Sequence, residues 1–125
     1  VYKRQKLMMA SWHGGMSIAY SQVGVAHALS YGLSFVLGIK HGIGNCIVFN
    51  QLHSFYPKDV ILFRQMMEKQ NIQLPRDICK NLSDTQFNNM IDIAFKLEPL
   101  WENAIGKDWK QTISRESIKE LYRKM

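Results

Sequence analysis

Residues Gly24–Asn45 read GVAHALSYGLSFVLGIKHGIGN, an apolar segment in which Lys40 is the only formally charged residue. Two histidines, His27 and His41, stand fourteen positions apart in this apolar segment. Such a segment fits three kinds of structure: the packed core of a helical domain, a membrane span, or half of a metal site. The composition and the patterns of the rest of the chain distinguish among these three interpretations.

The composition indicates one globular domain. The chain has 125 residues, of which 46% are hydrophobic and 21% are charged, as in folded rather than disordered proteins. This length suits a single compact domain, so we expect residues 1–125 to form one all-helical domain. The chain opens with Val1 in the middle of a pattern and shows no signal-peptide arrangement. We therefore expect it to be a fragment of a longer protein.

The net charge and the cysteines restrict the kinds of partner and the cellular compartment that we expect. The net charge is +6, and the basic excess lies at the two ends of the chain. Neither end interleaves basic and aromatic residues as a nucleic-acid-binding motif would, so we expect a solvated surface and no nucleic-acid partner. Cys46 and Cys79 form no metal-ligand or redox spacing, and two cysteines exclude a disulfide scaffold. Free thiols favour a reducing compartment, the cytoplasm.

Helical signals dominate the second half of the chain, whereas alternating strand patterns are scarce. Pro57 stands at a suitable first helical position for residues 57–70, and the helix is expected to close before Pro75. Ser83 and Gln86 have the spacing of a capping box at the start of the next helix. That helix carries one apolar stripe, formed by Phe87, Met90, Ile91 and Ala94.

Ser114 is the expected N-cap of a last helix. Between the helices, residues 74–81 and 102–112 have the composition of connections. The sequence therefore predicts an all-α fold, a bundle of five to seven helices.

Residues 7–39 contain no Lys, Arg, Asp or Glu. A bilayer span needs roughly 20 apolar residues, so a membrane helix has to be considered. Against it, His13, Gln22, His27 and several serines and glycines keep the hydropathy below that of a Leu-rich span. We expect the run to form the central helices of a soluble all-α domain, with no membrane partner.

The two histidines of the segment have a structural and a chemical interpretation. A histidine on an apolar helix face is often a core residue whose ring nitrogens have hydrogen-bond partners. Desolvation, however, disfavours the charged imidazole, and the neutral ring is the form that binds zinc or iron. A straight helix from His27 to Leu37 would rise ~15 Å, so the chain must bend if His41 is to reach the same ion. We expect the bends at Gly32 and Gly38.

Two histidines do not complete a catalytic zinc site, which takes three protein ligands and an open position. The other histidines of the chain are His13 and His53. We expect a packing or surface role for His13, with a place in the pocket as the alternative, and we assign no chemistry to His53. The chain therefore holds at most part of a metal site.

The segment GVAHALSYGLSFVLGIKHGIGNCIVFN resembles the signature of the iron-containing, or group III, alcohol dehydrogenase family. In that family a G-x-x-H segment and an H-G-x-x-N-[AC] segment supply two ligands to a catalytic iron or zinc. The matching positions here are Gly24, His27, His41, Gly42, Asn45 and Cys46. The resemblance is most specific over residues 7–56. It implies that His27 and His41 bind the metal, Zn or Fe(II).

The resemblance also implies a two-domain enzyme in which an N-terminal α/β domain binds NAD or NADP and a helical C-terminal domain holds the metal. The remaining family ligands, an Asp and a His in an Asp-x-x-x-His pair, are absent from this chain. The chain alone is then expected to be catalytically inactive. The implied partners are a small-molecule alcohol or sugar-acid substrate and a second copy of the protein in a homodimer.

Many members of the family carry a second histidine four residues after the first ligand, and here that position is Tyr31. A reference pKa of about 10 makes tyrosine a poor base at neutral pH, so Tyr31 either orients the substrate and relays a proton or simply packs. The segments SQVGVAHALSYGLS, KHGIGN and LEPLWENAIGKDW resemble the branch that oxidises the terminal hydroxyl of 3-deoxy-octulosonate, an eight-carbon sugar acid used in lipopolysaccharide synthesis.

Two rival classes stay open at this point. One is a related metalloenzyme, such as a glycerol dehydrogenase or a dehydroquinate synthase, although their histidines are usually spaced more widely. The other is a non-catalytic helical interaction domain in which the histidines only pack.

Overall fold

Every regular element of the protein is a helix. The computed structural model describes all residues, 1–125, and the all-α prediction is confirmed. Eight helices follow one another: α1 (Tyr2–Tyr20), α2 (Val25–Leu37), α3 (His41–Gln51), α4 (Pro57–Lys69), α5 (Asp84–Lys96), α6 (Glu98–Ile105), α7 (Trp109–Thr112) and α8 (Arg115–Arg123). The predicted count of five to seven helices was wrong, because α7 and the second half of α6 lie in residues 102–112, which were expected to be a connection.

Pro99 explains this difference. Prolines were expected to mark helix boundaries, and Pro99 does follow the end of α5. It also occupies the first turn of α6, where the missing N–H of proline removes no helical hydrogen bond. The indole Nε1 of Trp101 then donates to the buried carbonyl oxygen of Ala94 at 2.8 Å, which ties α6 back onto α5.

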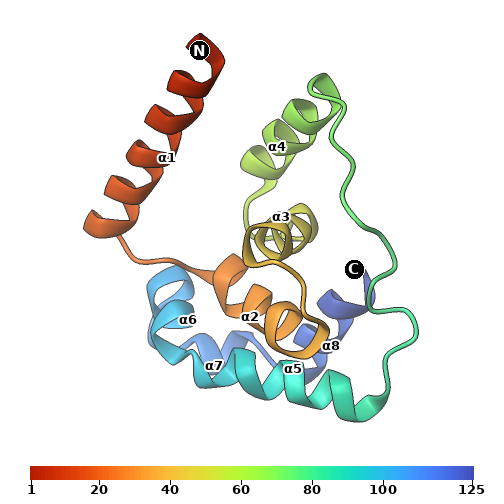
Figure 1. The fold of residues 1–125 in the computed structure, drawn as a ribbon. Helices are drawn as coiled ribbons and strands as arrows, with labels where there is room; N and C mark the ends of the chain where they lie inside the picture. Colours follow the sequence, from red (N-terminus) through yellow and green to blue (C-terminus); the bar gives the residue numbers. More distant parts are fainter.

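Helix α2 is the centre of the packing (Figure 1). It packs against α3, α5 and α6, and six of its thirteen residues are buried. The predicted apolar stripe of α5 is confirmed, since its four members are all buried. The largest side chains of the core are Trp101, Trp109 and Tyr122. The histidine-bearing helix is therefore held firmly on one side by the core.

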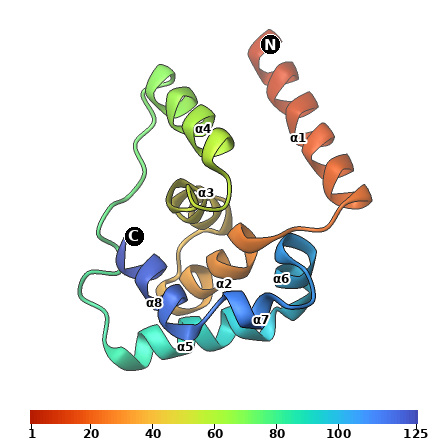
Figure 2. The ribbon, with the colours of Figure 1, turned by 180° about the vertical axis from the view of Figure 1, so that it is seen from behind.

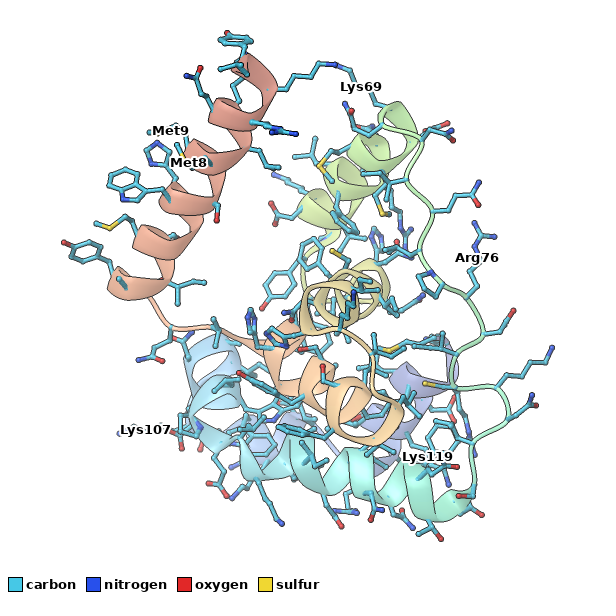
Figure 3. The ribbon with its side chains drawn as sticks, in the orientation of Figure 1. Met8, Met9, Lys69, Arg76, Lys107 and Lys119 are labelled. Atoms are coloured by element: carbon cyan, nitrogen blue, oxygen red, sulfur yellow. The ribbon has the colours of Figure 1, made fainter.

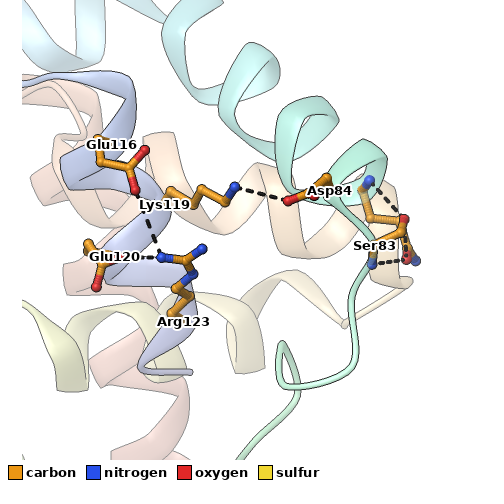
Figure 4. Close-up of polar contacts among 7 residues, drawn as sticks. Ser83, Asp84, Glu116, Lys119, Glu120 and Arg123 are labelled. Atoms are coloured by element: carbon orange, nitrogen blue, oxygen red, sulfur yellow. Dashed lines mark hydrogen bonds and ion pairs between the residues drawn. The ribbon is translucent and has the colours of Figure 1, made fainter.

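The junction of α5 and α8 shows why these helices begin where they do (Figure 4). The Ser83 hydroxyl accepts a hydrogen bond from the Gln86 backbone N–H at 3.3 Å, and the Gln86 Oε1 accepts one from the Ser83 N–H at 3.0 Å. The predicted capping box is thus confirmed, and Ser114 caps α8 in the same way. Lys119 of α8 pairs with Asp84 of α5 at 3.0 Å.

Helices α1 and α4 project from the same side of the molecule (Figures 1 and 2), and α4 packs on α3. No residue of α1 is buried, and Met8 and Met9 point away from the other helices (Figure 3). The expectation that residues 7–39 supply central helices is wrong for α1, because no other helix of this chain packs on it, and right for α2. None of the eight helices combines the length and the hydropathy that crossing a bilayer requires.

Candidate metal centre

The turn between α2 and α3 brings the two histidine-bearing helices together. Gly38 ends α2 in the left-handed conformation, with φ 68°, and its N–H donates to the Ser34 carbonyl at 3.1 Å. Glycine adopts this conformation without the steric cost that a Cβ would bring. Two further residues lead to His41, the first residue of α3. The bend expected at Gly38 is confirmed.

Gly32 does not bend the chain, and that expectation is wrong. It lies inside the regular helix α2, on the side that faces Met90 of α5 and Tyr122 of α8. A Cβ at this position would lie 2.5 Å from the Tyr122 hydroxyl oxygen and 3.1 Å from the Cβ of Met90. Gly32 is therefore required for close packing rather than for a turn. The hydroxyl of Tyr122 donates to the Leu29 carbonyl at 2.8 Å, which fixes α2 against α8.

His27 and His41 face each other across the turn. Their ring centroids lie 5.2 Å apart with an interplanar angle of 61°. Tyr31, one turn after His27 on α2, stacks on the His41 ring at 5.0 Å and 24°. Phe35 continues the row by stacking on Tyr31 at 6.0 Å. All three predicted site residues therefore belong to one cluster of rings, in which Phe35, 74% exposed, is the outermost member.

The surroundings of His27 favour its neutral form. Desolvation lowers the pKa of His27 below the ordinary value of histidine, and the neighbouring His41 lowers it further. A histidine with a lowered pKa keeps the lone pair that a metal ion requires near neutral pH.

Asn45, one turn after His41 on α3, contacts the other histidine. Its Nδ2 donates a hydrogen bond to the His41 Nε2 at 3.0 Å. Its Oδ1 is buried and has no hydrogen-bond partner. An unpaired buried acceptor costs free energy that a water or hydroxyl group of a bound ligand would recover. Asn45 belongs to the motif that resembles the family but was not among the predicted site residues, although its four-residue spacing from His41 indicates contact on a helix.

A hollow of about 240 Å³ opens beside these residues, and its lining is mostly apolar. It is lined by Ala26, His27, Asn45, Cys46, Phe49 and Phe63. Phe63 comes from α4 and meets the ring of Phe49 edge-on at 5.3 Å. The apolar lining explains the desolvation of His27, because few polar groups of the hollow can form the interactions that water would form with the ring.

These residues fit a divalent transition-metal ion. Two imidazoles bound to one tetrahedral zinc at about 2.0–2.1 Å place their ring centroids roughly 5 Å apart, as His27 and His41 do. No group of three or more His, Cys, Asp or Glu side chains gathers anywhere in the chain. The chain therefore presents two neighbouring imidazoles without a third group of this kind beside them, and the Oδ1 of Asn45, on the next turn of α3, is buried without a partner.

The other two histidines lie outside the ring cluster. His13 is exposed on α1 and contacts Trp12 edge-on at 4.9 Å. His53 is exposed in the turn between α3 and α4. The surface role expected for His13 agrees with its exposure, and its alternative place in the pocket does not.

The fold and the site define an all-helical domain that presents two neighbouring imidazoles from successive helices. Residues 1–120 match the Fe-containing alcohol dehydrogenase family, C-terminal. The match spans nearly the whole chain, so this protein belongs to the Fe-containing alcohol dehydrogenase family and corresponds to its C-terminal domain. Membership in this family assigns the chain to the alcohol-oxidising oxidoreductases.

Proposed function

We propose that this chain is the metal-binding half of a metal-dependent, NAD(P)-linked alcohol dehydrogenase, with His27 and His41 as metal ligands. The observation that carries the proposal is the meeting of the two imidazoles at 5.2 Å in a family member whose chemistry is the oxidation of alcohols. Zn or Fe(II), when bound, would supply Lewis acidity to the substrate hydroxyl. The NAD(P) that accepts the hydride is bound mainly by another domain of the same protein.

The chain's own residues contribute binding and orientation. His27 and His41 offer two imidazoles, the lowered pKa of His27 favours its neutral form, and the apolar lining around His27 excludes water from that side. Tyr31 has its ring against His41, and this contact supports a role for its hydroxyl in orienting the substrate or relaying a proton at the substrate oxygen. We propose this orienting role for Tyr31 because the ring stack fixes it beside a ligand rather than in the core.

The exposed apolar faces of α1 and α4 support the proposal that this domain works within a longer protein. On α1, Leu7, Met8 and Trp12 are exposed, and on α4 Leu62 and Met66 are exposed. A single helix without tertiary packing is marginal in water, so helix α1 needs a covering surface. We propose that the remainder of the polypeptide covers it and brings an Asp-x-x-x-His pair to complete the ligand set.

We further propose a primary alcohol as substrate, with the terminal hydroxyl of 3-deoxy-octulosonate as the first compound to test. The support is the likeness of the segments around His27, around His41 and at residues 97–109 to that branch. Glycerol is the matched alternative substrate, because glycerol dehydrogenases are the related enzymes with a similar helical domain.

The test uses the whole protein that contains this domain, prepared as wild type, His27→Ala, His41→Ala and the control His53→Ala. We expect about one zinc or iron per chain in the wild type and in His53→Ala, with alcohol-dependent reduction of NAD or NADP. His27→Ala and His41→Ala should each lose metal and turnover together, because each variant lacks one of the proposed ligands. Full metal content and full turnover in His27→Ala would refute the ligand assignment. A wild type that holds no metal would favour an interaction domain.

A further inference from the structure

Helix α4 carries an apolar side that the core of this chain does not cover. Val60 is the only buried residue of the helix, and the ring of Phe63 meets Phe49 of α3 edge-on at 5.3 Å. On another side of α4, Leu62 is 62% exposed and Met66 is 48% exposed. Because α4 projects from the body of the molecule, this second side is open to solvent (Figures 1 and 3).

The exposed side of α4 has a regular pattern. Four exposed residues follow one another at spacings of three, four and three, which places them on one stripe of the helix surface: Asp59, Leu62, Met66 and Lys69. We call these four residues the α4 stripe. Its two charged members take part in none of the ion pairs within the chain. The stripe therefore has an anionic end, an apolar middle and a cationic end.

This order of residues is complementary to itself when the helix is reversed. In an antiparallel pair, Asp59 lies opposite Lys69 of the second copy, and Leu62 lies opposite Met66 of the second copy. Two-fold symmetry then repeats both contacts, and alternating spacings of three and four are those with which paired helices meet. A parallel pair would instead bring like charges together at both ends, which is unfavourable. We propose that α4 is a dimerisation helix, which binds a second copy of this chain in an antiparallel pair through the α4 stripe.

Two features of the surroundings favour this partner. Arg64, in the middle of α4, donates from Nε to the Oδ1 of Asn50 at 2.8 Å and from Nη2 to the Asn50 carbonyl oxygen at 2.6 Å. These bonds hold the guanidinium against α3, so the cations of two copies do not meet at the centre of the pair. Lys69 lies at the outer end of α4 (Figure 3), so an antiparallel arrangement keeps the bodies of the two copies at opposite ends.

The accessible surface of the chain leaves room for such a contact. The chain exposes 8684 Å², whereas a compact monomer of this size exposes about 6,900 Å². The excess, about 1,800 Å², is more than twice the ~800 Å² that each partner contributes to an interface of standard size. A dimer contact through α4 therefore leaves the surface of α1 for the remainder of the polypeptide.

The first experiment measures the dimer dissociation constant of the whole protein by sedimentation equilibrium. Leu62→Glu places two carboxylates in the apolar middle of the pair, so we expect it to weaken the dimer about 100-fold or more. Ile61 is 46% exposed on the same helix but lies outside the stripe, and the control Ile61→Glu should leave the constant unchanged. A monomeric wild type, or equal constants for the wild type and Leu62→Glu, would overturn the proposal.

The second experiment exchanges the charges of the stripe. Asp59→Lys and Lys69→Asp each bring like charges together at both ends of the pair, so we expect each to weaken the dimer about 10-fold. The double variant Asp59→Lys/Lys69→Asp restores opposite charges between the copies and should recover the wild-type constant. A double variant that fails to recover would refute self-pairing and would indicate that the stripe binds another part of the polypeptide, whose charges have not changed.

The third experiment joins the two copies covalently. Positions 59 and 69 lie ~15 Å apart along one helix, too far for a disulfide within one chain. Asp59→Cys/Lys69→Cys should therefore give a covalent dimer on oxidation with glutathione disulfide. The wild type, whose Cys46 is half-buried and Cys79 buried, and either single variant should stay monomeric on a denaturing gel. A double variant that also stays monomeric would contradict the antiparallel pair.

Discussion

Replacing Gly32 by alanine tests how tightly α2 must lie on α5 and α8. The new Cβ would stand 2.5 Å from the Tyr122 hydroxyl oxygen, 3.1 Å from the Met90 Cβ and 3.2 Å from the Met90 carbonyl oxygen. Two of these atoms belong to the α5 backbone or lie next to it, so they cannot swing away as a side-chain end can. The Tyr122 side chain is fully buried and has no free space to enter.

The size of the effect follows from three opposing contributions. Overpacking a core costs about 1–3 kcal/mol, and displacing the Tyr122 hydroxyl from the Leu29 carbonyl costs about 1 kcal/mol more. Alanine gains about 1 kcal/mol over glycine inside a helix. We therefore expect Gly32→Ala to lower the free energy of unfolding by about 1–3 kcal/mol. The same substitution at Gly15 on α1 meets no atom within 4 Å and should be neutral or slightly stabilising.

The measurement is urea unfolding of the whole protein, followed by the fluorescence of the buried Trp101 and Trp109. Combining Gly32→Ala with Tyr122→Phe removes the atom nearest to the new Cβ. The double variant should lose less stability than the sum of the two single variants, with a coupling of about 0.5–3 kcal/mol. An unfolding midpoint of Gly32→Ala equal to the wild type, or strictly additive losses, would refute close packing through the hydroxyl.

Three further predictions concern stability. Burial raises the pKa of the Cys79 thiol from 9.0 to about 11, so the thiol contributes stability that is complete below pH 9.0 and is lost as the pH rises through about 11. Urea midpoints in that range should fall less steeply for Cys79→Ala than for the wild type. A hydrogen bond and the positive charge from Lys119 lower the pKa of Asp84. The contribution of the Asp84 carboxylate to folding stability is therefore lost as the pH falls through the acid range. Acid unfolding of Asp84→Asn should depend less on pH than that of the wild type, and an unchanged profile would speak against the ion pair. Ser83→Ala removes the bond to the Gln86 N–H and should cost about 1 kcal/mol in the same urea assay, as N-cap deletions do.

The helix caps and the turn that depend on residues close together in the chain could be predicted from the sequence. The capping box of Ser83 and Gln86 and the cap at Ser114 depend on side chains and backbone groups three residues apart, so the sequence alone specifies them. The turn at Gly38 is of the same kind, because one left-handed residue decides it. The convergence of His27 and His41 follows from that turn once the two helices are placed, and the resemblance to the family supplied its chemical meaning.

What escaped prediction depends on partners far away in the sequence. Gly32 was expected to bend the helix, because its real reason, the hydroxyl of Tyr122, lies ninety residues later. Helix α1 was expected to be central but has no buried residue. The cause is similar, because an apolar pattern shows that a helix needs a packing partner but does not show which surface provides it. Pro99 misled the element count, since a proline that ends one helix also suits the first turn of the next.

The short link between α2 and α3 has a consequence for how the domain assembles. Because only residues 38–40 separate the helices, an ion held by both imidazoles would close the short loop of chain that runs from His27 to His41, and closing so small a loop costs little entropy. The ion would act as a staple within one helical hairpin. If the proposed ligand assignment holds, this part of the ligand shell would form early, before the distant parts of the polypeptide have found their places.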